Sequence, residues 1–126
     1  MGEERWARGE SQRPHYNLEA WKGAMVLVRV VYELTRKFPA EELYGLTSQM
    51  RRGAVSIPSN LAEGAARTGK KEFAQFLSIA RGSLSELETQ WLISEDLGYV
   101  SHEHGVFKLA DRVSKLITGL HKNLTK

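Results

Sequence analysis

Apolar residues recur at helical spacing through most of the chain, and no segment shows the strict alternation of a half-buried strand. The first such segment covers residues 17–37. Its polar residues fall on one stripe, and the rest of its circumference is apolar. The β-branched run at residues 26–31 is compatible with a strand, but the length and the spacing of the polar residues favour a helix. Asn17 is the expected N-cap.

Three further helices are predicted, at residues 46–66, 70–97 and from Ser101 to about 124. Gly98 is suited to end the third helix, and Ser101 is suited to cap the fourth with Glu103 in its first turn. The connections between these segments are short. The fold class predicted is therefore all-α, an antiparallel up-down four-helix bundle over residues 18–126. Residues 1–17 are expected to form a mobile polar tail.

The apolar arc of the first helix is wider than the core of one small bundle requires. A second buried contact explains such an arc, so we expect an oligomer with Leu27, Val31 and Leu34 in its interface. Polar residues also line the second and third helices. They indicate hydrogen bonds that fix the register of the bundle, or a contact between subunits. A ligand groove is a less favoured interpretation. From this line we expect Ser56, Asn60 and Glu86 at the interface. Trp21 and Trp91 are expected in the core or the interface.

The composition is that of a folded protein, with 126 residues, 41% hydrophobic and 26% charged. The absence of cysteine excludes disulfides and thiolate chemistry. The longest apolar run, residues 24–28, is far shorter than the roughly 20 residues that span a bilayer. The amino-terminal segment lacks the apolar stretch of a secretory signal. We therefore expect a cytoplasmic protein with no membrane partner.

Few residue patterns point to catalysis. The segment from Gly64 to Lys71 approaches the phosphate-binding pattern G-x-x-x-x-G-K-[ST], but Lys71 replaces the hydroxyl residue and a helix precedes it where the motif needs a strand. A turn between two helices is the favoured interpretation. No Glu-x-x-His pair suggests a metal site in a bundle, and His102 and His104 diverge on a helix. We expect no catalytic residue, no metal, no cofactor and no enzymatic activity.

Basic residues form a line along one face of the fourth helix: Lys108, Arg112, Lys115, Lys122 and Lys126. Such a line can bind phosphate backbones without base specificity. The alternative is an ordinary solvated helix face, which charge runs usually are. A second basic patch is predicted at Arg67, Lys70 and Lys71. The formal net charge of +3 permits contact with nucleic acid but does not require it.

Two long motifs resemble one known family. The first is QMRRGAVSIPSNLAEG at residues 49–64, and the second is EFAQFLSIARGSLSELETQ at residues 72–90, followed by LGY at 97–99. Together with FP at 38–39 and YGL at 44–46, they resemble the four-helix-bundle proteins encoded in intervening sequences of bacterial 23S rRNA genes, over about residues 18–124. The resemblance implies a homopentameric ring with a central channel. It also implies similarity to the accessory variability proteins of diversity-generating retroelements, basic pentameric bundles that associate with a reverse transcriptase and nucleic acid.

Five copies of a chain with charge +3 would carry about +15, which strengthens attraction to nucleic acid. The main hypothesis is a non-enzymatic homo-oligomer that binds RNA or DNA through the basic residues of its fourth helix and its second patch. The alternative is a protein-interaction scaffold or an accessory factor for a partner such as a reverse transcriptase, without a nucleic-acid role of its own. A nucleotide-binding enzyme that uses residues 64–71 is a remote third hypothesis.

Overall fold

The structure, a computed structural model, describes residues 13–102 and 105–126. Four α-helices make up most of this part of the chain, and two short 3-10 helices precede the first two of them. In chain order the elements are η1 (Pro14–Asn17), α1 (Glu19–Thr35), η2 (Ala40–Glu42), α2 (Leu46–Ala65), α3 (Lys70–Asp96) and α4 (Val106–Leu124). The prediction of an all-α fold with four helices is confirmed.

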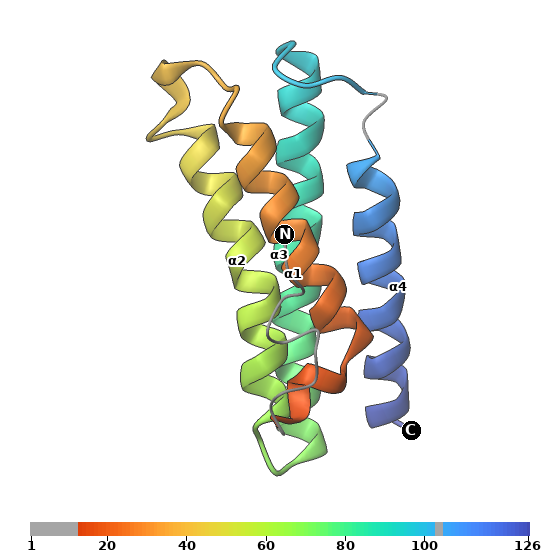
Figure 1. Ribbon diagram of the computed structural model, residues 1–126. Coiled ribbons are helices and arrows are strands. Elements are labelled where there is room, and N and C mark those ends of the chain that lie inside the picture. Colours follow the sequence, from red (N-terminus) through yellow and green to blue (C-terminus); the bar gives the residue numbers. More distant parts are fainter. Residues whose placement is uncertain (1–12, 103–104) are drawn as a thin grey trace.

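Each long helix packs against two others, so that the four surround one core. Among the described residues, α2 contacts α1 and α3, and α4 contacts α3 and α1, while the diagonal pairs make no close backbone approach. Figure 1 shows the α1–α2 and α3–α4 connections at one end of the molecule and the α2–α3 connection at the other. Helices that follow one another in the sequence therefore lie side by side.

The core is a single cluster of buried side chains from all four helices. Trp91, the largest of these side chains, belongs to α3, and Trp21 of α1 is buried in the same cluster. Both tryptophans were expected in the core or an interface, and the core is where they lie. The other large fully buried residues are Leu27, Val31, Met50, Ile57, Leu61, Leu77, Leu84, Val113 and Ile117.

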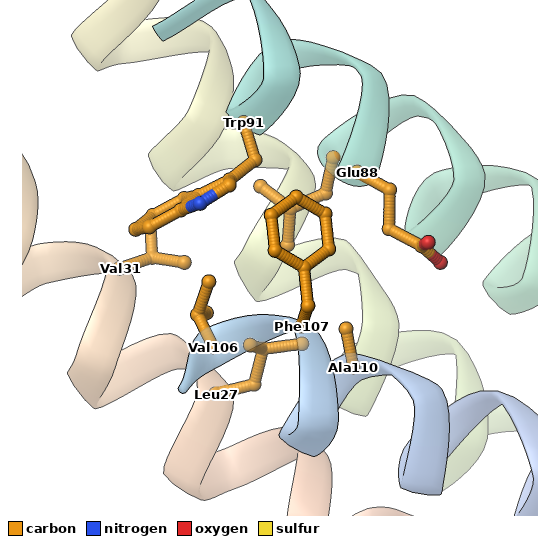
Figure 2. A pocket seen from close by; sticks show the side chains of 8 residues that line it. Leu27, Val31, Glu88, Trp91, Val106, Phe107 and Ala110 are labelled. Atoms are coloured by element: carbon orange, nitrogen blue, oxygen red, sulfur yellow. The ribbon is translucent and has the colours of Figure 1, made fainter. Parts of the chain in front are cut away.

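The expectation that Leu27 and Val31 form an oligomer interface is wrong. Both side chains are 0% exposed in the single chain. Figure 2 shows them pointing into the space that Trp91 and Val106 also face. The apolar arc of α1 is wide because α2 covers one flank and α4 covers the other. Leu34 is half-buried and packs against the same core.

Two helix starts also differ from the prediction. Asn17 ends η1, and Leu18 occupies the N-cap of α1 with no side-chain cap. Ser101 does not cap α4, because α4 begins only at Val106, with Gly105 before it. The predicted first-turn residue Glu103 lies outside the described residues. Gly98 does end α3, with a φ of 80° that favours glycine.

Part of the predicted tail is structured. Residues 14–17 form η1, and the Tyr16 ring stacks on Trp21 with centroids 5.2 Å apart. The His15 ring lies edge-on to Trp21 at 4.9 Å. Burial, with a smaller contribution from Arg13, lowers the pKa of His15 from 6.5. Contact with α1 therefore begins at η1, while residues 1–12 lie outside the described part.

The α1–α2 and α3–α4 connections are tied together by one carboxylate. Tyr99 Oη donates to Glu42 Oε2 at 2.9 Å, and the Leu46 backbone N–H donates to Glu42 Oε1 at 3.1 Å. The Phe38 and Tyr99 rings lie beside this contact, with centroids 5.3 Å apart. The bond to Glu42 is the main reason that the pKa of Tyr99 is raised above 10.0. The folded state therefore holds the phenolic proton more tightly than the unfolded chain does.

Replacing Tyr99 with Phe should test this bond through its dependence on pH. Because the pKa is raised in the folded state, the stabilisation is fully present below 10.0 and is lost as the pH rises through the folded value. The difference in free energy of unfolding between wild type and Tyr99→Phe should therefore be constant near neutral pH and shrink at alkaline pH. Urea denaturation across this range measures it, and Tyr44→Phe, whose side chain lies in solvent, is the control. A difference that stays constant into alkaline pH would contradict the assignment.

A second prediction concerns the close approach of α2 and α3 at Gly64. A methyl group there would lie 2.8 Å from Phe76 Cβ and 3.0 Å from Phe73 Cδ1, and Phe76 Cβ cannot move without its backbone. Gly64→Ala should therefore lower the free energy of unfolding by about 1–3 kcal/mol. Chemical denaturation measures the change.

Gly82→Ala is the matched control for this prediction. Gly82 is exposed within α3, and a methyl group at this position meets nothing within 4 Å. Alanine should raise stability there by about 0.5–1 kcal/mol, because glycine loses more backbone freedom on folding. Equal effects of the two substitutions would show that α2 and α3 are not closely packed at Gly64.

Candidate nucleic-acid interface

The outer face of α4 carries the predicted basic line. Its residues Lys108, Arg112, Lys115 and Lys122 are all exposed. They are separated by three, four or seven positions, which keeps them on one side of the helix over about 20 Å. The buried residues of α4 lie on the opposite side and are Val106, Ala110, Val113 and Ile117. The chain therefore presents a continuous row of cations that takes no part in its core.

One member of this row has an acidic neighbour. Lys115 Nζ lies 3.0 Å from Asp111 Oδ2, and both side chains are mostly exposed. An exposed ion pair of this kind contributes little to stability and opens readily. Asp111 was not among the predicted site residues, although a carboxylate four residues before a lysine on a helix is the usual signal for such a pair. Asp111 reduces the positive charge of the row without interrupting it.

The second predicted patch lies where α2 passes into α3. Arg67 is exposed, but its Nη2 lies 2.9 Å from Glu63 Oε2 and its guanidinium stacks 5.1 Å from the Phe76 ring centroid. These contacts hold the Arg67 side chain against its own chain. Lys70 and Lys71 are exposed in the first turn of α3. Figure 1 shows this connection at the end of the bundle where α4 also ends, and Lys122 belongs to the last turn of α4.

The segment that approached a phosphate-binding motif is a turn between two helices. Gly64 belongs to the last turns of α2, and Gly69 is the N-cap residue of α3. A phosphate-binding loop of that type follows a strand. The turn interpretation is confirmed.

The polar line between α2 and α3 makes hydrogen bonds within one chain. The hydroxyls of Ser56 and Ser83 lie 2.9 Å apart, and Asn60 Nδ2 donates to Ser56 O at 2.8 Å and to Ser56 Oγ at 3.0 Å. These bonds join α2 to α3 or brace α2 itself. The sequence left several interpretations of this polar line open. The bond between α2 and α3 supports one of them, that the line fixes the register of the bundle.

A polar groove of about 330 Å³ lies beside these bonds. Glu86 is exposed at its edge and accepts a hydrogen bond from Gln90 Nε2 at 3.3 Å. Gln90 is only 6% exposed, and its Oε1 has no hydrogen-bond partner among the described residues. This buried acceptor lies behind the groove rather than in its lining. Its lining residues are Gln49, Arg52, Gly53, Ser56, Ser83 and Glu86.

Within residues 13–102 and 105–126, no three acidic or histidine side chains gather as ligands of one ion. No helix in this range is both long and apolar enough to cross a bilayer. His102 is exposed, and His121 Nε2 lies 3.4 Å from Ser78 Oγ of α3. Figure 2 shows a small apolar pocket between α1, α3 and α4. Its volume is about 10 Å³, which is too small for an organic ligand.

Comparison with protein families accounts for the two long motifs. The family model described as 23S rRNA-intervening sequence protein matches residues 16–119. The chain belongs to this family. The match spans α1, α2, α3 and most of α4, so that Lys108, Arg112 and Lys115 of the basic line fall within the 23S rRNA-intervening sequence protein region and Lys122 follows it. No protein of curated function matches the chain.

The bond between Ser56 and Ser83 leads to a prediction for this 23S rRNA-intervening sequence protein. Ser56→Ala removes the hydroxyl that Ser83 and Asn60 share, and it should lower the free energy of unfolding by about 1 kcal/mol. Ser59→Ala, three residues further along α2 at an exposed position, should change it by less than about 0.5 kcal/mol. Chemical denaturation of both variants gives the comparison. If Ser56→Ala and Ser59→Ala were equally stable, the Ser56–Ser83 hydroxyl pair would not fix the register of α2 and α3.

Proposed function

We propose that this 23S rRNA-intervening sequence protein is a non-enzymatic homo-oligomer that binds RNA or DNA through the outer face of α4. The observation that carries the proposal is the row of exposed cations opposite the buried face of that helix. Such a row neutralises phosphates and releases their counterions, and it requires no base specificity. The proposed basic surface also includes Lys70 and Lys71 in the first turn of α3, and Arg67, which pairs with Glu63. The proposed compartment is the cytoplasm, where RNA and DNA are accessible.

The proposed assembly is a homopentamer of antiparallel up-down bundles. The short connection at residues 66–69 favours this course of the chain. A line of exposed side chains on one side of α3 supports a second buried contact. Ile79, Ile93 and, just past the helix end, Leu97 are each about half exposed, and Glu86 lies between Ile79 and Ile93. This line replaces Leu27 and Val31 as the proposed contact between copies, together with the neighbouring Ser56 and Asn60. Five copies would pool their charge to about +15.

Reversing the charge of the α4 row tests the nucleic-acid proposal. The variant Lys108→Glu, Arg112→Glu, Lys122→Glu should lose salt-dependent binding to RNA and DNA, because three phosphate contacts become repulsive. Its subunit number should not change. Fluorescence anisotropy over a series of salt concentrations measures affinity, and light scattering measures assembly.

The single variants Arg112→Glu and Arg81→Glu form a matched pair for this experiment. Both arginines are exposed and lie within long helices, on α4 and α3 respectively, and both variants change the net charge equally. Arg112→Glu should weaken binding clearly more than Arg81→Glu. Equal losses would show that total charge alone decides binding, and unchanged affinity of the triple variant would exclude the α4 row.

The proposed assembly is tested at Ile93. Ile93→Glu places a charge in the apolar line of α3 and should lower the subunit number seen by light scattering, while the fold survives because Ile93 is 45% exposed. Leu92→Glu is the control: Leu92 is 54% exposed but lies about 100° further around the helix. A monomeric wild-type protein at micromolar concentration would overturn the assembly.

A scaffold or accessory factor for a partner such as a reverse transcriptase is the second candidate function. The exposed apolar line on α3 also suits a foreign protein surface, since such lines commonly mark interfaces. In this case purified protein would show no salt-dependent affinity for RNA or DNA, and Ile93→Glu would leave its own subunit number unchanged.

A further inference from the structure

A second groove, unrelated to the α4 row, lies on the outer side of α1 and α2 beside the connection that joins them. Its volume is about 520 Å³. The groove combines two tyrosines, two arginines and two hydroxyl side chains, and none of its lining residues is acidic. The lining residues are Tyr32, Leu43, Tyr44, Thr47, Ser48, Arg51, Arg52 and Val55.

Tyr44 is the most exposed large hydrophobic residue in the part of the chain that the structure describes. Its side chain is 93% exposed, whereas Trp21 and Trp91 are buried. An aromatic ring in solvent adds nothing to the core, and it leaves both of its faces available for stacking. Tyr32 lines the same groove and is 37% exposed. The groove thus has one aromatic ring in solvent and a second at the surface.

The two arginines are held by neutral atoms. Arg51 Nε donates to Thr35 Oγ1 at 2.8 Å, and its guanidinium lies 4.7 Å from the Tyr32 ring centroid. Arg52 Nη2 donates to Ser48 Oγ at 3.3 Å. Hydroxyls and a ring orient the guanidinium groups without cancelling their charge. The groove therefore favours an anionic ligand that also has flat apolar rings.

Two glutamates of η2, close to the groove in the sequence, do not reverse its preference for an anionic ligand. Glu41 and Glu42 of η2 are not among the lining residues. The carboxylate of Glu42 already accepts the Tyr99 hydroxyl on one oxygen and the Leu46 backbone N–H on the other. Its charge is thus partly satisfied by donors of the subunit itself.

We propose that this groove binds an unpaired segment of RNA or DNA, with a base stacked on Tyr44 and the adjoining phosphates held by Arg51 and Arg52. Single strands are bound in this way, by aromatic platforms beside basic residues. A duplex keeps its bases stacked on one another and cannot offer one to Tyr44. This inference rests on the proposed nucleic-acid function and adds to it a preference for single strands.

The α4 row and the groove would then bind different parts of a nucleic acid. The row presents only cations and one carboxylate on a helix face, which suits phosphate backbones of either strand form. The groove supplies the stacking surface that the row lacks. The two surfaces lie on different helices, so that substitutions can separate them.

Substitutions at Tyr44 test the stacked base. Tyr44→Ala should weaken binding of a fluorescently labelled oligouridine of about 16 nucleotides by about 5- to 100-fold, the range expected for one stacked base. Binding of a duplex of the same length should change less than twofold. Tyr44→Trp should keep or improve the single-strand affinity because it keeps a ring. The exposure of Tyr44 means that none of these changes disturbs the core.

Arg52→Ala tests the phosphate contact. It should reduce the salt dependence of oligouridine binding by about one counterion, whereas Arg81→Ala, at an exposed site on α3, should not. The same measurements on oligothymidine show whether the groove accepts DNA as well as RNA. Light scattering on every variant records its subunit number.

The outcomes separate this inference from the proposed function. If Tyr44→Ala and Arg52→Ala bind oligouridine like wild type, while reversal of the α4 row abolishes binding, only the groove assignment is overturned. If wild-type protein binds neither oligouridine nor duplex, both are overturned. If Tyr44→Ala lowers the subunit number, the groove is a contact between copies and the assignment is wrong.

Discussion

The burial of α1 between two neighbours is the constraint on which the rest of the molecule depends. α1 carries apolar side chains over most of its circumference, and α2 and α4 cover its two flanks while Leu27 and Val31 reach the centre. Hydrophobic burial of this extent is the main favourable term in folding. α3 lies diagonally across the core from α1 and packs against α2 and α4, while the basic row of α4 remains at the surface.

The contact of α2 with α3 follows a different rule. Small residues let these helices approach closely, as Gly64 does against Phe73 and Phe76. A close approach brings backbone and hydroxyl groups together, and the Ser56–Ser83 pair uses it. A polar contact has more directional preference than an apolar one, so it fixes the axial position of one helix on the other. The distinctive sequence motifs of the chain lie on these two helices.

The sequence predicted much of this structure, because helical periodicity records which side of a helix is buried. The four helices, the basic row on α4 and the terminating role of Gly98 all follow from local spacing. The number of neighbours around a helix is not a local property. A wide apolar arc fits either a second subunit or a second neighbour in the same chain, and for Leu27 and Val31 the latter applies. The groove at Tyr44 was also missed, because it forms only when α1, α2 and their connection come together.

The anchoring of the α1–α2 connection has a consequence for recognition. Glu42 lies two residues before Tyr44 in the sequence. Its carboxylate accepts hydrogen bonds from the first turn of α2 and from the Tyr99 hydroxyl. The backbone that carries the Tyr44 ring is therefore already fixed before the proposed ligand binds. Ordering a flexible loop on contact consumes conformational entropy, whereas here only the torsions of single side chains remain to be fixed. A partner of modest size can for this reason gain useful affinity from a single ring.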